Sequence, residues 1–474
     1  MKIRTTSLRL WAKTVTCVIL LWSFLVQPES ARALSIEEET TLGQEFFSQV
    51  NRYFNLVEDD FLTEYLNSLG LYLVRSIEAP PFPFKFHLIK DGSLNAFAGP
   101  GGYVFMFTGL VMEMDRVDEL AAVVCHEIAH VSSRHLSTRI EQGKKIGLAT
   151  LAGILAGVLI GGPAAGAIVS GTMAAGIQTQ LYYSRNDERE ADQRGFLYMK
   201  NAGFDPRAMV SVLSKIERGR WMGTDKVPAY LLTHPTGPER MANLDIITRE
   251  YTEGPLPPEA HFFASEYPFF RATVVAMNMD SNDAARVFKS EIKGNPKSAV
   301  GYFGLGLVMK GKADFDMASE YLARASRIAP ESAVVLRSLA DTYQASGRVN
   351  EAISVLERVL EKDRNDKAAL FLLAGCHQYL GNDAKAVSIY EKLVSFPPVK
   401  DDVFHNLGVS YGRLEKLSLA HLNFGIFFKK KGESSKARFH FEKAMELAAG
   451  DNEMADRIKK AMESGPRPKR QQSR

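Results

Sequence analysis

Cysteine is scarce in this chain, with only three in 474 residues. Cys17 lies in the N-terminal leader discussed below, which leaves Cys125 and Cys376, far apart in the sequence and predicted in different domains. Small secreted folds that depend on disulfides are much richer in cysteine. The sequence therefore argues against a disulfide framework, and packing must supply the stability.

The chain also lacks an excess of charge of one sign. Its 58 Lys and Arg against 55 Asp and Glu give a formal net charge of +3, which is too small to indicate a nucleic-acid partner. With 46% hydrophobic and 24% charged residues, the composition is that of a globular protein. A length of 474 residues exceeds what one hydrophobic core usually serves, so we expect two or more domains.

The N-terminal region lacks a hydrophobic run long enough to span a bilayer. Near the N-terminus a basic stretch precedes a short apolar run, Val18 to Val26, and the small-residue pattern Ala31-Arg32-Ala33 follows. This is the layout of a secretory signal peptide, and the run is shorter than the roughly 20 residues that span a bilayer. We predict that residues 1–33 are a signal peptide rather than a membrane anchor, and that the mature chain is periplasmic.

Local patterns predict a mixed first domain. Residues 35 to about 63 are helical in pattern, and residues 84–89 alternate as a half-buried strand does. The turn-forming cluster Gly99-Pro100-Gly101-Gly102 joins residues 95–98 to the strand-like residues 103–107, which predicts a hairpin or sheet edge.

The first chemical motif, His126-Glu127-Ile128-Ala129-His130, lies in a predicted helix that Asp115 is expected to cap. At about 100° per residue, the two histidines share one helix face and can bind one metal ion. Glu127 is offset enough to avoid ligation, yet close enough to act as the general base for peptide hydrolysis. The motif therefore predicts a catalytic zinc site.

Glu188 is the expected third ligand, because a catalytic zinc normally has three protein ligands and one open position. Asp192 lies one helical turn later on the same face, where it can accept the ring N–H of His126 and fix its tautomer. Glu190 points away from Asp192, as on a solvated helix face.

Two further histidines are candidates for this site. His135 is expected on nearly the opposite side of the helix from His126, since no glycine breaks the helix before it, so we interpret it as structural. His234 lies in a loop rich in turn-forming residues. Three alternatives stay open for it: stabilising the oxyanion, occupying the open position of zinc so that the enzyme is latent, or no role.

Residues 146–177 are rich in Gly, Ala and Ile, and Gly161-Gly162-Pro163 divides them. Because neither half reaches a comfortable spanning length, we expect a helical hairpin packed near the active site. Peripheral membrane contact is the alternative, and an integral membrane protease is a functional interpretation that rests on this segment alone.

Beyond about Phe263 the sequence repeats with a period of 34 residues. The recurring positions are Leu305, Gly306, Ala318 and Leu322, then Leu339, Ala340, Ala352 and Leu356, then Leu373, Ala374, Ala386 and Tyr390. This is the tetratricopeptide pattern, with Gly347 and Gly381 at turns between helices. Near the end the phase becomes ambiguous, which predicts an extra helix or a half-repeat shift.

The HExxH motif, the later Glu188-x-x-Ala191-Asp192 and the segment from His234-Pro235 to Arg240 resemble the peptidase family of the HtpX heat-shock protease and the CAAX prenyl endopeptidase. The resemblance covers residues 35–250. It implies one Zn²⁺ per chain held by His126, His130 and Glu188, with Glu127 catalytic.

The same resemblance carries expectations for residues around the ligands. It implies that His234 is a regulatory or transition-state group, and that Asp192 and Arg240 support the ligands. It also implies that residues 95–108 form an edge strand beside the cleft, where substrate backbone pairs as an added strand.

With a signal peptide in front and repeats behind, the chain is similar to family members that act in outer-membrane assembly. This implies that unfolded or misassembled proteins are substrates, and that the barrel-assembly machinery is a partner of the repeats.

We therefore predict an α+β zincin-like metalloprotease domain, residues 34–262, followed by an all-α tetratricopeptide-repeat solenoid, residues 263–463, and a disordered basic tail, residues 464–474. The alternative is a chaperone-like assembly scaffold whose protease site is latent or secondary. The intact Glu127 argues against a purely structural metal site, which needs no base beside its ligands.

Overall fold

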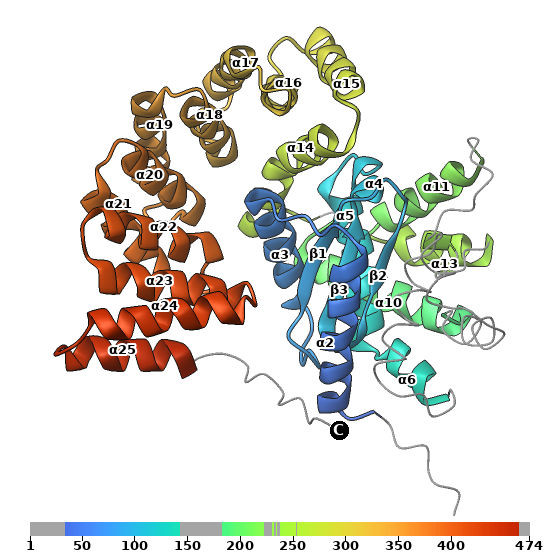
Figure 1. Ribbon diagram of the computed structural model, residues 1–474. Coiled ribbons are helices and arrows are strands. Elements are labelled where there is room, and N and C mark those ends of the chain that lie inside the picture. Colours follow the sequence, from blue (N-terminus) through green and yellow to red (C-terminus); the bar gives the residue numbers. More distant parts are fainter. Residues whose placement is uncertain are drawn as a thin grey trace, which may run out of the picture. The chain divides into compact units, whose positions relative to one another are not determined.

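The computed structural model describes residues 34–142, 183–221, 230–231, 234, 238–252 and 254–463 (Figure 1). The predictions for residues 1–33, 146–177 and 464–474 therefore lie outside the described residues. Among the helices of the described ranges, none combines the length and the apolar character that crossing a bilayer requires.

The chain divides into two compact units between Tyr267 and Pro268. This division lies inside helix α14 (Pro258–Asn278). The predicted boundary between residues 262 and 263 falls in the same helix and stays a prediction.

Two helices open the first unit, in the region where the sequence pattern is helical. A capping box at Ser35 starts helix α2 (Ile36–Tyr53), and Phe54 ends it in an extended conformation. The Asp59 side chain then accepts a hydrogen bond from the Leu62 N–H at 3.0 Å and starts helix α3 (Asp60–Val74). The predicted helical segment, residues 35 to about 63, is therefore interrupted over residues 54–59, where a second cap starts a new helix.

A three-stranded sheet of order β1-β3-β2 follows. Strand β1 (Lys85–Ile89) runs parallel to β3 (Tyr103–Phe107), and β2 (Ala96–Ala98) pairs antiparallel with β3. Gly101 and Gly102, with φ angles of 71° and 89°, make the turn between β2 and β3, so the predicted strand and hairpin are confirmed. In the described residues, the expectation that residues 95–108 form an edge strand is met by β2 and is wrong for β3, which is the central strand of the sheet.

Helix α2 covers the sheet through aromatic contacts. The ring of Phe46 meets Phe97 and Phe105 edge-on, with centroids 6.1 and 6.0 Å apart. A Cβ atom added to Gly43 of α2 would lie 2.4 Å from the carbonyl oxygen of Pro100, so the helix can approach the hairpin turn only because this residue is glycine.

The other elements in the described part of the first unit are helices. Their bounds are α4 (Thr108–Met112), α5 (Val117–Ser132), α6 (His135–Gln142), α10 (Arg185–Ala202), α11 (Ala208–Trp221) and α13 (Pro238–Arg249). Helix α5 contacts β2, α10 and α11, and nearly all its side chains are buried.

The start of helix α5 differs from its prediction. Its N-cap is Arg116, and no side chain caps it. Asp115 instead pairs with Lys215 at 2.6 Å, while its backbone N–H donates to the Glu119 carboxylate at 2.6 Å. Asp118 and Glu119 give the helix an acidic first turn, which is favourable at the positive end of the helix dipole.

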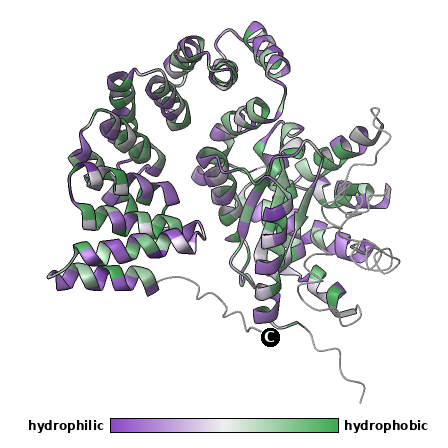
Figure 2. Ribbon diagram, viewed as in Figure 1, coloured by the Kyte–Doolittle hydropathy of each residue, from purple (hydrophilic) through white to green (hydrophobic). Residues whose placement is uncertain are grey.

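The second unit is a series of antiparallel helix pairs. Its helices are α15 (Ser281–Gly294), α16 (Ala299–Gly311), α17 (Phe315–Ile328), α18 (Ala333–Ala345), α19 (Val349–Lys362), α20 (Lys367–Tyr379), α21 (Asp383–Val394), α22 (Asp401–Arg413), α23 (Leu417–Lys430), α24 (Ser434–Leu447) and α25 (Asn452–Glu463). These helices each show hydrophilic and hydrophobic residues in Figure 2, as expected of helices that bury one face. Gly347 and Gly381 adopt left-handed φ angles of 79° and 75° in the turns, which confirms the predicted register.

The end of the array shows the predicted half-repeat shift. A Cβ atom added to Gly408 in α22 would lie 2.7 Å from the ring of Phe424 in α23. A Cβ atom added to the neighbouring Gly425 would lie 2.6 Å from the ring of Phe441 in α24. Helix α23 therefore supplies the large residue of one pair and the small residue of the next.

Candidate metal centre

Two histidines that could bind a metal ion come from helix α5. His126 and His130 lie one turn apart on the same face, and their Nε2 atoms are 3.0 Å from each other. Both side chains are buried. Burial is the main cause that holds the pKa of His130 well below its ordinary value, so this ring is neutral, as a metal ligand must be.

Helix α10 brings in the carboxylate. Ser184 and Asp187 form a capping box that starts the helix, so Glu188 lies in its first turn. The Glu188 oxygens lie 3.4 Å from Nε2 of His126 and 3.4 Å from Nε2 of His130. Burial alone would raise the pKa of Glu188, but Arg240 and the surrounding histidines hold it well below its ordinary value, so the carboxylate is ionised.

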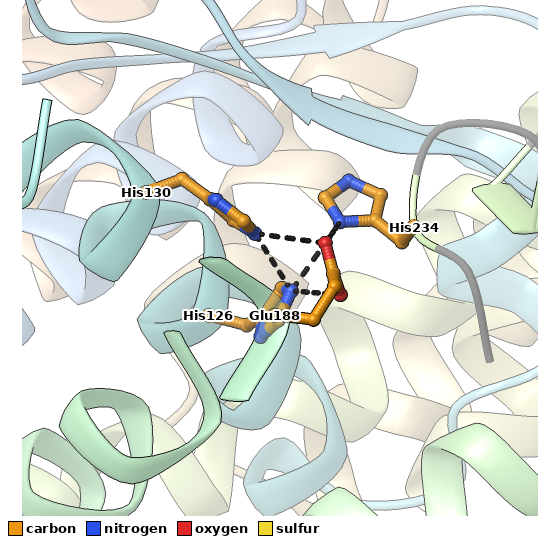
Figure 3. A group of neighbouring side chains, drawn as sticks. All are labelled: His126, His130, Glu188 and His234. Atoms are coloured by element: carbon orange, nitrogen blue, oxygen red, sulfur yellow. Dashed lines mark hydrogen bonds and ion pairs between the residues drawn. The ribbon is translucent and has the colours of Figure 1, made fainter. Parts of the chain in front are cut away.

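His234 completes the group in space. Its Nδ1 atom lies 3.0 Å from Oε1 of Glu188 and 3.3 Å from Nε2 of His126. Its backbone N–H donates to the Tyr230 carbonyl at 2.8 Å, and the ring of Tyr230 stacks on the imidazole at a centroid distance of 4.4 Å. In Figure 3 the four side chains point toward one another.

The group fits a divalent metal ion. One ligand atom from each of His126, His130, Glu188 and His234 lies within 4.8 Å of the others. A tetrahedral zinc with bonds of about 2.0–2.1 Å holds its ligand atoms about 3.3 Å apart, close to the separations of 3.0 to 3.4 Å found here. Imidazole nitrogens with one carboxylate are a donor set that suits zinc.

Glu127 lies beside the group and is fully buried. In the described part of the chain, neither of its carboxylate oxygens has a hydrogen-bond partner, although Oε1 lies 3.4 Å from Nε2 of His234. Burial raises the pKa of this carboxyl above its ordinary value. A buried carboxylate with free lone pairs at a metal group is suited to take a proton from water.

Asp192 and Arg240 lie behind the ligands. Nδ1 of His126 is 3.1 Å from Oδ1 of Asp192, and Arg240 donates to both Asp192 oxygens at 2.7 and 2.8 Å. Arg240 also lies 2.5 Å from the Glu188 carboxylate. The Arg240 guanidinium therefore links Glu188 to Asp192. The predicted supporting roles of Asp192 and Arg240 stay predictions.

The two acids outweigh burial at His126. Burial and Arg240 favour the neutral ring, yet hydrogen bonds to Asp192 and Glu188 raise the pKa of His126 to about 9. A bound metal ion supplies the positive charge that the proton otherwise brings to this place.

His135 does not lie where the helical pattern put it. Helix α5 ends at Ser132, Arg134 has a φ of 52°, and helix α6 begins at His135. The break turns His135 back toward the centre, so that its Nδ1 lies 2.9 Å from Nδ1 of His130. The prediction of the opposite face is therefore wrong, although His135 does not belong to the four-residue metal group.

Sequence reasoning missed two aromatic neighbours of the ligands. The ring of Tyr183 stacks on His130 at a centroid distance of 3.8 Å, and Tyr230 stacks on His234. Tyr183 directly precedes the capping residue Ser184, which is a weak signal, and Tyr230 carries none. The residues on both sides of His234 in its loop, 232–233 and 235–237, lie outside the described residues.

Comparison with known families places matches in both units. The sequence matches peptidase family M48 over residues 61–248, which include the whole metal group. It matches a tetratricopeptide repeat family over residues 309–369 and 343–402.

Some individual relatives align with residues of both units. The chain is 30% identical over 366 residues to the β-barrel assembly-enhancing protease of Escherichia coli strain K12, which covers 76% of this chain and 74% of the relative. A Vibrio cholerae protein described as a "putative beta-barrel assembly-enhancing protease" is 32% identical over 316 residues, covering 65% of this chain and 64% of that relative. The mitochondrial metalloendopeptidase OMA1 of Arabidopsis thaliana is 33% identical over 153 residues, 32% of this chain and 29% of the relative.

Proposed function

The chain belongs to the β-barrel assembly-enhancing proteases of peptidase family M48, and from this membership we propose that it is a zinc endopeptidase of outer-membrane protein quality control. Its substrates are unfolded or misassembled proteins in the periplasm. Its repeats bind those substrates or partners such as the barrel-assembly machinery.

The observation that carries the proposal is the pairing of a metal group with a free base. Four donors of the zinc type converge within 4.8 Å, and Glu127 lies beside them, buried, with no hydrogen-bond partner for its carboxylate among the described residues. A purely structural site needs no such base.

When bound, zinc supplies a Lewis acid that activates water and polarises the scissile carbonyl. A Glu127 oxygen takes a proton from the attacking water, and the same carboxyl then donates a proton to the leaving amine. Asp192 keeps the metal-facing nitrogen of His126 free of a proton, because it accepts the N–H at Nδ1. Arg240 holds Asp192 and Glu188 in place through its guanidinium.

The position of His234 supports a latent state. Structural zinc sites fill four positions with protein donors, whereas catalytic sites keep one open for water. His234 lies in the place of a fourth donor, with Nδ1 within 3.0 Å of Glu188 and 3.3 Å of His126. We therefore favour the latch among the roles that the sequence left open, and peptidase activity then requires His234 to move aside.

Strand β2 is the proposed seat for substrate. In the described part of the chain it pairs with β3 on one side only, and it contacts helix α5, which carries the HExxH motif. An unfolded segment can add to such an edge by backbone hydrogen bonds, whereas a folded protein rarely offers an extended strand.

The repeats offer a surface for protein binding. A hollow of about 330 Å³ is lined mainly by the first helices of successive pairs, α18, α20 and α22, and by α21. Amide, aromatic and basic side chains contribute to it, among them Gln344, Phe371, Gln378, Asn406 and Arg413. Such a lining suits an extended polypeptide, whose backbone groups need hydrogen-bond partners.

The test is zinc content and casein cleavage of the mature chain and three variants. We expect the wild type to contain one zinc ion, Glu127→Gln to keep zinc and lose cleavage by at least about 100-fold, and the exposed control Glu113→Gln to behave as wild type. His234→Ala should keep zinc and cleave faster than wild type, because it opens the fourth position.

Other outcomes separate the alternatives. Absence of zinc from every variant would reject the metalloprotease. Full cellular function of Glu127→Gln would favour the scaffold, and slower cleavage by zinc-loaded His234→Ala would make His234 a transition-state group.

A further inference from the structure

The backbone at the end of helix α5 brings His135 into contact with His130, a proposed metal ligand. Arg134 takes a left-handed backbone conformation directly after the helix, at a φ of 52°. Its guanidinium pairs with the buried carboxylate of Glu39 in α2 at 2.8 Å, and it also contacts the Leu34 carbonyl. The conformation is therefore held by contacts with a distant segment, and it turns the next residue, His135, onto the ring of His130.

If His130 binds a metal, it must be the donor, and His135 the acceptor, of the hydrogen bond between the two rings. Nε2 of His130 faces the other ligand atoms, at 3.0 Å from Nε2 of His126 and 3.4 Å from Glu188. Nδ1 of His130 faces away from them and lies 2.9 Å from Nδ1 of His135. Nε2 of His130 can bind the metal only when it carries no proton, and the neutral ring then carries its proton on Nδ1. The hydrogen bond between the two Nδ1 atoms must therefore be donated by His130.

The far side of His135 favours the same arrangement. His135 is 6% exposed, and its Nε2 lies 3.4 Å from Oε2 of Glu190, within ion-pair distance. Glu190 is itself held, because the Ser133 hydroxyl and the Arg194 Nε–H donate to its Oε1 at 2.9 and 2.8 Å. A carboxylate at this place favours the proton on Nε2 of His135, which leaves the lone pair of Nδ1 to accept from His130.

We propose that His135 is a positioning residue of the metal centre, which fixes His130 in the tautomer that binds metal, and that Glu190 orients His135. This inference rests on the proposed metal site. It gives the two ligand histidines different supports: His126 donates to a carboxylate, Asp192, whereas His130 donates to a neutral imidazole backed by a carboxylate. Loss of such supporting residues typically lowers metal affinity by about 10- to 100-fold.

The test is the zinc affinity of the mature chain, measured by competition with a chromophoric chelator, together with the visible absorption of the cobalt-loaded protein. His135→Leu removes the acceptor and should weaken zinc binding by about 10- to 100-fold and change the cobalt spectrum. His135→Asn restores an acceptor near the position of Nδ1 and should stay within a few-fold of wild type. His87→Leu, which removes a half-buried histidine of strand β1, is the matched control and should bind zinc as wild type does.

A second variant guards against poor folding of His135→Leu. The Glu190 side chain is 45% exposed, so Glu190→Ala should fold normally and weaken zinc binding several-fold. Wild-type affinity in His135→Leu or in Glu190→Ala overturns the inference, as does an equal loss in His135→Asn and His135→Leu. A wild-type chain that binds no zinc overturns the proposed function as well, which separates the two failures.

Discussion

Asp192 contacts both a candidate metal ligand and a buried guanidinium. It accepts a hydrogen bond from a ligand histidine, His126, and it forms two hydrogen bonds with the buried Arg240. Burial alone would raise the pKa of Asp192, but Arg240 and His126 hold it below its ordinary value, so the residue stays ionised. We therefore expect the charge of Asp192, and not only its acceptor atom, to support His126.

Replacing this charge by an amide tests that point. We expect Asp192→Asn to keep the fold and to lower zinc affinity by about 10- to 100-fold, because the amide leaves Arg240 without one of its counter-charges and binds the His126 N–H less strongly. Chelator competition measures the change. Asp245→Asn on the exposed face of α13 is the control, and equal affinities in both variants would show that the charge has no such role.

The motif residues were accessible from sequence because their geometry is local. Two histidines and a glutamate within five helical residues, and a Glu and Asp one turn apart in a later helix, have fixed spacing on their own helices. The break before His135 could not be foreseen, since it depends on Glu39, 95 residues away, which holds a non-glycine residue in a left-handed conformation.

The ends of elements show the same contrast between local and distant causes. The capping box at Ser184 and the glycine turns of the repeats follow from short sequence signals, and the glycine turns were predicted. The cap expected at Asp115 is absent because Lys215 and Glu119 compete for that residue. The stacking of Tyr183 and Tyr230 on the ligands likewise results from contacts that no short pattern records.

The helix break at Arg134 predicts an unusual order of stabilities. Arg134→Ala and Arg134→Gly both lose the contacts with Glu39 and Leu34, but only glycine adopts a left-handed φ without cost. We expect the alanine variant to be less stable than the glycine variant by about 1 kcal/mol. Denaturant unfolding of the metal-free protein measures the difference, and equal stabilities would mean that the left-handed conformation imposes no strain.

Helix α23 predicts a sensitive glycine in the repeat unit. A methyl group at Gly425 would meet the Phe441 ring at 2.6 Å, so Gly425→Ala should destabilise this unit by about 1–3 kcal/mol. Gly311→Ala, where an added Cβ meets nothing within 4 Å, should be neutral or slightly stabilising. Thermal unfolding of both variants gives the comparison, and a neutral Gly425→Ala would argue against the close packing of α23 on α24.

The metal group lies wholly in the first of the two units. Its donors come from helix α5, helix α10 and residue 234, while the described repeat residues contribute none. Removal of metal by a chelator should therefore abolish cleavage and lower the unfolding temperature of the first unit alone. A ligand at about 1,000 times its Kd contributes about 4 kcal/mol, which a calorimetric scan with and without chelator resolves. Equal shifts of both unfolding transitions would contradict a metal site confined to one unit.

The donors of the metal group come from three separate segments of the chain, so their order in the sequence determines when the group can form. The donors emerge from the ribosome in the order His126, His130, Glu188 and His234, so a chain interrupted before residue 188 carries only the two histidines. All four donors have been synthesised by residue 234, before any residue of the repeats. The last donor to be synthesised is His234, which is proposed to occupy the fourth position of zinc. The residue that keeps the enzyme latent is therefore made soon after the three other donors.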